Sequence, residues 1–147
     1  MEIKYLQTFF KNAGAGSCYC DIIIKIACDI NKIPYNLQNI GKAFDVGFDQ
    51  GFVTFNQNNY ADEKTSFFVK NPTAWLKCLT GKNYDVIVKD RNYIPTKDEI
   101  EVDFYTLSEE NGANGIGHFV MPNYDPILGS NTKKNGFIYS KRIFRRR

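Results

Sequence analysis

The hydrophobic period of the sequence changes near residue 82, and this change constrains the fold more than any other feature. Before it, apolar side chains recur every three or four residues, as on one face of a helix. After it, short runs rich in β-branched and aromatic residues are typical of strands. Helices followed by antiparallel strands predict an α+β fold, in which N-terminal helices pack on one face of a C-terminal sheet.

Helix boundaries in the first part are marked by residues that cap or break helices. Serine and asparagine side chains accept backbone N–H bonds at a helix start, proline suits the first turn, and glycine often follows the last turn. The sequence predicts a helix over residues 2–11, a second from Cys18 (capped by Ser17) to Pro34, a third capped by Asn36, and a fourth from Asn71-Pro72 to Gly81.

The second part of the sequence predicts strands, and its polar segments predict loops. The polar residues 56–64 and the Gly/Asn-rich residues 109–117 indicate surface loops. No repeat or linker divides the chain, so residues 1–147 are expected to form one domain, large enough to bury a core without metal or disulfide staples. Strands are expected over residues 84–88, 100–107, 116–121 and 137–144, the last entered through a two-residue hairpin turn at Asn135-Gly136.

Charge and cysteine content exclude several classes of protein. The net charge of +3 comes largely from a basic cluster over residues 141–147, which we interpret as a solvated tail. No interleaved basic and aromatic patch indicates a nucleic-acid partner. The N-terminus lacks a secretory leader, and the longest uncharged apolar run, residues 22–24, is too short to span a bilayer. We therefore expect a cytoplasmic protein with reduced thiols and no membrane or cofactor requirement.

Cys18 is the best placed of the four cysteines to act as a nucleophile. It follows a glycine-rich segment and opens an apolar helix, where unpaired N–H groups and the helix dipole stabilise a thiolate. Cys20 points to another side of the helix, Cys28 lies within the apolar run, and Cys78 comes late in its helix. The alternative is that Cys18 is a small buried residue, which is the usual fate of a free cysteine.

His118 is the only histidine, and it is therefore the one candidate for the base that a cysteine nucleophile usually needs. It stands at the start of a predicted strand, directly after a loop. The alternative is an ordinary histidine of the surface or the core, with no chemical role. Its neighbourhood in the sequence, rather than the residue alone, makes the catalytic interpretation worth testing.

A carboxylate follows His118 at a spacing that a tight hairpin would bring back. If Pro122-Asn123 is the turn and Met121 faces Tyr124, then His118 and Asp125 lie on the same face as diagonal neighbours. Asp125 is then expected to hold the imidazole by one ring nitrogen, as the third member of a catalytic triad does. The alternative is that Asp125 only caps the turn with its side chain.

These segments resemble the papain-like cysteine peptidase superfamily, and in particular its bacterial and phage branches similar to bacteriocin-processing peptidases. The matching residues are 16–20, 117–120 and 124–126. The resemblance implies a papain-like fold, Cys18 as nucleophile, His118 as base and Asp125 as the orienting residue. It also implies that Asn12, six residues before Cys18, stands where relatives carry an oxyanion-hole glutamine.

A second resemblance covers most of the chain. Residues 129–130, 135–136 and 140–142 are similar to plasmid- and prophage-encoded proteins of Borrelia spirochaetes. Those proteins have no established activity, so this resemblance implies nothing about chemistry. It adds only an expected setting, that of a plasmid- or prophage-encoded protein.

The leading hypothesis is the hydrolysis of an amide in a peptide or a peptidoglycan cross-link. A second is a catalytically inactive papain-like module that binds a partner or serves a structural role. The shorter side chain of Asn12 and the short separation of His118 and Asp125 support it. A third hypothesis, a zinc site of Cys18, Cys20, Cys28 and His118, is disfavoured because zinc ligands usually lie on turns rather than along one helix.

Overall fold

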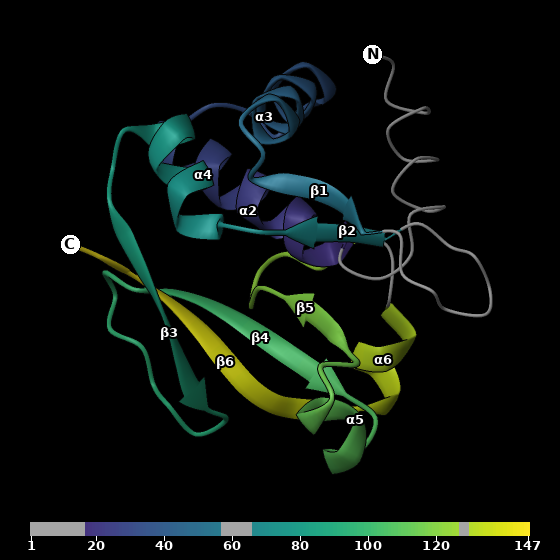
Figure 1. Cartoon of the computed structure of the whole chain (residues 1–147). Coiled ribbons are helices and arrows are strands. Elements are labelled where there is room, and N and C mark those ends of the chain that lie inside the picture. The colour runs from purple at the N-terminus through teal and green to yellow at the C-terminus, as the bar shows by residue number, and fades with distance from the viewer. Residues whose placement is uncertain (1–16, 57–65, 127–129) are drawn as a thin grey trace. The chain divides into compact units, whose positions relative to one another are not determined.

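The computed structural model describes residues 17–56, 66–126 and 130–147 (Figure 1). The chain forms two compact units, Met1–Lys82 and Asn83–Arg147. The helix predicted over residues 2–11 lies outside the described residues, and so does most of the loop predicted over residues 56–64. The expectation of one domain for the whole chain stays a prediction.

The described part of the first unit contains three helices and one β-hairpin (Figure 1). Three of the predicted caps are confirmed: the side chains of Asn36 and Asn71 each accept a backbone N–H, and Gly81 adopts the left-handed conformation that ends its helix. The antiparallel hairpin was not predicted from the sequence. The elements are α2 (Ser17–Asn31), α3 (Leu37–Asp49), β1 (Val53–Asn56), β2 (Ser66–Val69) and α4 (Pro72–Thr80).

The core of the first unit is built around α2 and α4. Three consecutive isoleucines of α2, residues 22–24, are fully buried, which confirms the prediction of a helix covered on most sides. Trp75 of α4 is also fully buried, and its indole N–H donates to the carbonyl oxygen of Ala43 at 3.1 Å. A bond of this kind satisfies the polar atom that a buried tryptophan carries.

Trp75 also lies against the backbone of α3 at Gly47. A Cβ atom added at Gly47 would lie 2.8 Å from two carbons of the indole ring, whereas a Cβ added at Gly41 of the same helix meets nothing within 4 Å. Both glycines are inside a helix, where glycine costs about 0.5–1 kcal/mol relative to alanine. Packing against the Trp75 indole therefore requires glycine at position 47, whereas position 41 has room for a larger side chain.

Two alanine substitutions in α3 should have opposite effects on stability. Gly41→Ala is expected to raise the free energy of unfolding by about 0.5–1 kcal/mol because the unfolded chain loses freedom at no steric cost. Gly47→Ala is expected to lower it by about 1–3 kcal/mol because the methyl group overlaps Trp75. Urea denaturation of the two variants measures both effects, and equal signs would contradict this packing.

The second unit is a four-stranded antiparallel sheet in the order β3-β6-β4-β5, with two short helices (Figure 1). Together with the helices of the first unit it confirms the α+β class. In the described part of the chain, every helix is too short or too polar to cross a bilayer. The elements are β3 (Tyr84–Asp90), β4 (Ile100–Thr106), α5 (Glu109–Ala113), β5 (His118–Val120), α6 (Ser130–Asn135) and β6 (Phe137–Arg146).

Two local predictions for this unit are wrong. Asn135-Gly136 is not a hairpin turn: Asn135 is the last residue of α6, and the strand that follows pairs with β3 and β4. Gly136 is needed there because an added Cβ would lie 2.2 Å from the carbonyl oxygen of Thr106. Residues 109–117, predicted as a loop, contain α5, whose start is capped by the side chain of Ser108.

The prediction of a solvated basic tail is only partly right. Residues 141–146 belong to β6, a strand paired on both sides, and Lys141 is buried, whereas the side chains of residues 145–147 are exposed. The guanidinium of Arg145 pairs with Glu99, and that of Arg147 pairs with Asp85, both at 2.8 Å. Arg142 lies over two aromatic rings. Strand pairing, which the charge pattern does not reveal, turns this segment into part of the sheet.

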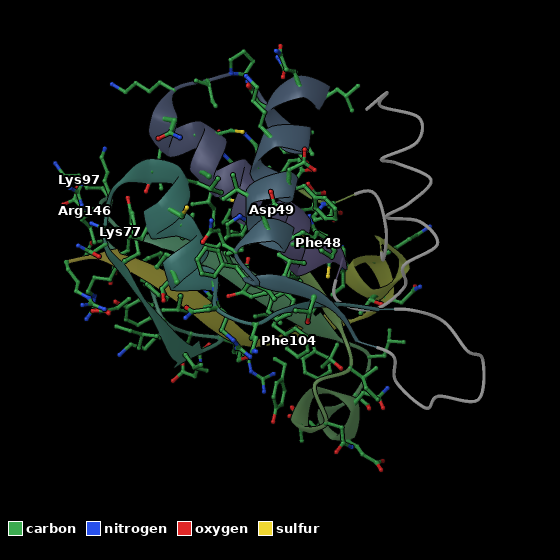
Figure 2. All side chains as sticks on the ribbon, turned by 45° about the horizontal axis from the view of Figure 1, so that its top comes forward. Phe48, Asp49, Lys77, Lys97, Phe104 and Arg146 are labelled. Carbon is green, nitrogen blue, oxygen red and sulfur yellow. The ribbon has the colours of Figure 1, made fainter. Side chains whose placement is uncertain are left out.

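Each face of the sheet has its own chemistry. One face carries the apolar residues Val102, Phe104 and Phe144, all buried, and Phe104 is labelled in Figure 2. The rings of Phe104 and Phe119 are 4.7 Å apart, and the guanidinium of Arg142 lies 5.7 and 5.6 Å from their centroids. Because side chains alternate along a strand, the residues between these belong to the opposite face. That face carries the ionisable groups of the candidate site.

Candidate functional site

His118 is the first residue of β5 and lies directly opposite Tyr105 of β4. Only 2% of its surface is exposed. The residue before it must be glycine, because a Cβ at Gly117 would lie 2.1 Å from the carbonyl oxygen of Tyr105. Close contact between the two backbones therefore determines where the imidazole enters the sheet.

A tight turn brings Asp125 to the imidazole, as the sequence predicts. Met121 and Tyr124 form an antiparallel bridge, with N–H···O bonds of 2.8 and 3.2 Å in the two directions. The His118 Nε2 atom is 2.9 Å from Oδ1 of Asp125. The predicted contact between His118 and Asp125 is confirmed. The register that was assumed for it, with Met121 facing Tyr124, is confirmed as well.

The contact assigns different roles to the two imidazole nitrogens. As a carboxylate, Asp125 can only accept, so Nε2 carries the hydrogen, and in the neutral ring Nδ1 then holds the lone pair. The second oxygen of Asp125, Oδ2, lies 3.9 Å from Nζ of Lys133 on α6. Nδ1 is thus the nitrogen that is able to take a proton from a nucleophile. This is the arrangement in which a carboxylate orients a catalytic histidine.

Replacing Asp125 should release the Nε2 hydrogen of His118. In the parent protein we expect a slowly exchanging imidazole N–H in proton NMR spectra, because the hydrogen is bonded and the ring is buried. Asp125→Ala is expected to abolish the signal, whereas Asp125→Asn keeps an acceptor oxygen and should retain it. Lys133→Gln, which alters the other side of the carboxylate, serves as the control and should leave the signal in place.

Cys18 is the second residue of α2, which begins at Ser17, one residue earlier than predicted. Its side chain is half-buried, so it differs from the other cysteines of the same helix. Cys20 and Cys28 are buried, and burial raises the pKa of both thiols. Cys78, late in α4, is exposed. Among the described thiols, Cys18 therefore combines a helix start with partial accessibility.

The predicted constellation is only partly assembled by what the structure describes. It brings together His118 and Asp125, both in the second unit. Cys18 belongs to the first unit, and its pairing with His118 stays a prediction. Asn12 lies outside the described residues. Among the residues described, no group of three or more His, Cys, Asp or Glu side chains is placed to hold a metal ion.

Two acidic residues of β4, Glu101 and Asp103, form a group that the sequence analysis missed. They share the ionisable face, since side chains two residues apart point the same way. Asp103 is 5% exposed, directly opposite Lys141 of β6 and Val120 of β5. The ammonium of Lys141 lies 3.4 Å from Oε2 of Glu101. A buried carboxyl group, a half-buried one and a buried ammonium group are thus close to one another.

The environment of Asp103 opposes its ionisation. Burial, followed by a hydrogen bond and charge repulsion from Glu101, raises the pKa of Asp103 from 3.8 to about 7, although Lys141 and Lys133 act in the opposite direction. The signal for this group in the sequence is the alternation of acidic and apolar residues over 101–104. That pattern alone usually marks a solvated face, and only the burial of this face makes it unusual.

A loop between β3 and β4 holds Lys141 in place. The Lys141 ammonium donates to the carbonyl oxygen of Tyr93 at 2.9 Å. Glu99 anchors this loop: it accepts from the Thr96 backbone, from Arg145 and from the Tyr93 hydroxyl, and these bonds lower its pKa from 4.5 to about 2. The position of the lysine therefore depends on a loop that is bonded to β6.

The sequence as a whole matches one protein family. Residues 3–146 match the family DUF261, described as a protein of unknown function. The chain belongs to the DUF261 family. No curated protein and no solved structure matches it. The family match spans both units of the DUF261 chain, so the cysteine of α2 and the histidine of β5 lie within the same matched region.

Neutralising Asp103 should change how the stability of this DUF261 protein depends on pH. The folded chain keeps a proton on Asp103 that the unfolded chain releases between about pH 4 and 7, so this group's contribution to stability falls over that range. The difference in free energy of unfolding between the parent and Asp103→Asn should fall by about 4 kcal/mol from pH 4 to 8, at about 1.4 kcal/mol per pKa unit.

Urea denaturation at several pH values measures this difference. Asp98→Asn removes an exposed carboxyl group from the same unit and is the matched control. Its stability relative to the parent should change little over the same pH range, because exposed charges contribute little. If the difference in free energy of unfolding between the parent and Asp103→Asn stays constant from pH 4 to 8, the pKa of Asp103 is not raised.

Proposed function

We propose that this protein is a papain-like cysteine hydrolase in which Cys18 is the nucleophile and His118 the base. One observation carries the proposal: the His118 imidazole is bonded through Nε2 to Asp125, which leaves Nδ1 as the proton acceptor. A histidine held in this way is the base that an activated cysteine requires. The place of Cys18 in the first turn of α2 supports the choice of nucleophile.

The reaction would be a two-step acyl transfer. Cys18 gives its proton to Nδ1 of His118, and the sulfur attacks the amide carbonyl carbon. The oxyanion is stabilised by the backbone N–H of Cys18 and by Asn12. His118 then passes its proton to the leaving amine as the C–N bond breaks, which leaves a thioester. Water, deprotonated by His118, attacks this thioester and releases the carboxylic acid and the thiol.

The substrate is proposed to be a peptide or the peptide cross-link of peptidoglycan, since both contain amide bonds of the required kind. The chemistry needs a reduced Cys18, which suits a cytoplasmic protein whose thiols are kept reduced. A peptidoglycan substrate would require release of the protein from the cell, whereas a cytoplasmic peptide would not. The two substrates are distinguished by assaying each with the purified protein.

A catalytically inactive binding module is the second candidate, and the burial of the imidazole favours it. Only 2% of the His118 surface is exposed, so a substrate can reach the imidazole only if the residues around it move. The same pair of residues would then serve to hold the hairpin of residues 118–125 in shape. Structural ion pairs of this type are common, and the contact by itself does not demand catalysis.

Thiol labelling separates these two functions. At pH 7 we expect Cys18 to react with iodoacetamide at least about tenfold faster than Cys78, because an activated thiol is largely thiolate whereas an ordinary one is a few per cent thiolate. His118→Ala should reduce the Cys18 rate to about that of Cys78. Mass spectrometry of peptides from partly labelled protein measures both rates in one sample.

Cys78 is a suitable internal standard because it is exposed and stands away from any helix start. Tyr19→Phe, a change next to Cys18 that leaves His118 intact, controls for local disturbance of α2. Asp125→Asn should reduce the rate less than His118→Ala, since the amide still orients the ring. If Cys18 reacts no faster than Cys78 in the parent, and His118→Ala changes nothing, the hydrolase proposal fails.

A further inference from the structure

The acidic pair of β4, Glu101 and Asp103, lies next to His118 in the sheet. Asp103 faces Val120 across the β4–β5 ladder, and Tyr105 faces His118. Asp103 and His118 are therefore diagonal neighbours on one face, a relation that places their Cα atoms roughly 7–8 Å apart. Tyr105 lies on the same face, opposite His118. Burial raises the pKa of Tyr105 most, and the negative charges of Asp103, Asp125 and Glu101 raise it further.

The arrangement of hydrogen-bonding groups assigns the charge within the pair. Lys141 stands opposite Asp103 in the register, yet its ammonium contacts Glu101 at 3.4 Å and the Tyr93 carbonyl at 2.9 Å. Asp103 is bonded to Glu101, and its Oδ1 atom has no partner among the described residues. A buried carboxylate with an unpaired oxygen is far more costly than a neutral acid in the same place.

We propose that Asp103 is a neutral acid in the folded protein until the pH rises to about neutrality, that it donates its proton to the Glu101 carboxylate, and that this shared proton makes Asp103 a positioning residue for His118. With the proton in place, one negative charge on Glu101 is balanced by one positive charge on Lys141. Loss of the proton adds a second negative charge at a diagonal position from the imidazole, where it favours the protonated ring.

The titratable groups around Asp103 come from its own strand and from three other elements. Glu101 and Tyr105 lie on β4; the others are Lys141 on β6, Lys133 on α6, and His118 and Asp125 on the β5 hairpin. Two of these carry positive charge and oppose retention of the proton, whereas Glu101 favours it. The balance among them, rather than burial alone, determines the pH at which Asp103 ionises.

The consequence for chemistry rests on the proposed function. A Cys18–His118 pair reacts as thiolate and imidazolium, and ionisation of Asp103 favours the imidazolium form. The rate of Cys18 alkylation should then gain a second step as the pH rises through the ionisation of Asp103. The electrostatic link between Asp103 and His118 does not require any activity, so it can be tested separately.

NMR titration of the full chain from pH 5 to 9 tests the shared proton and the link together. The Asp103 carboxyl carbon should titrate near pH 7, and Glu101→Gln should move that midpoint down by about one pH unit, since a like charge and a bonded acceptor are removed. Because His118 is the only histidine, its ring signal is unambiguous. It should change as Asp103 ionises in the parent, and this step should be missing in Asp103→Asn.

Asp98→Asn, at an exposed position, is the control and should keep this step. An Asp103 carbon that titrates near its ordinary value, or a His118 curve that is identical in the parent and Asp103→Asn, overturns the inference. Alkylation rates of the same proteins give the separate result. If the NMR step is present and the alkylation rate shows no second step, then the proton pair stands and the proposed Cys18–His118 chemistry fails.

Discussion

Strand β4 is hydrogen-bonded on both sides, to β6 and to β5, and the register of these two ladders determines which side chains meet. In one ladder Asp103 faces Lys141, and in the other Tyr105 faces His118. A slip of one residue in either ladder would move its side chains to the opposite face. The imidazole, the acidic pair and the lysine are therefore neighbours only because both registers hold at once.

Two glycines and a β-bulge lie where β4 meets its neighbours. Gly117 and Gly136 sit where any side chain would strike the backbone of β4, at Tyr105 and Thr106. Between Phe104 and Tyr105 the pairing with β6 shifts by one residue, so that Tyr139 is the extra residue of a bulge. Bulges re-aim side chains and increase local twist. The bulge occurs just where the strand passes from the acidic pair to the position that faces His118.

The local features of the chain were largely predictable, since they depend on residues close in sequence. The caps at Asn36 and Asn71, the glycine that ends α4 and the turn at Pro122-Asn123 follow from the conformations that these residue types favour. The contact between His118 and Asp125 was predictable for the same reason, because a two-residue turn determines its own register.

The errors have a common physical origin in pairing between distant segments. Asn135-Gly136 is a strong hairpin signal, but the strand that follows it joins β3 and β4 instead of turning back on its neighbour. The basic residues 141–147 resemble a solvated tail in the sequence, but two of them pair with acidic residues from elsewhere in the chain: Arg145 with Glu99, and Arg147 with Asp85. Asp103 was missed because burial of a strand face is a property of the assembled sheet.

The sequence by itself determined the α+β class, the caps of α3 and α4, the one available histidine and the hairpin that returns Asp125 to it. These depend on periodicity, on capping and turn chemistry, and on composition, all of which act over a few residues. Only the tertiary structure decided that β6 lies between β3 and β4 and that Asp103 is buried opposite Lys141. Long-range strand pairing brings together residues 31 to 62 positions apart, and no local preference specifies such a pairing.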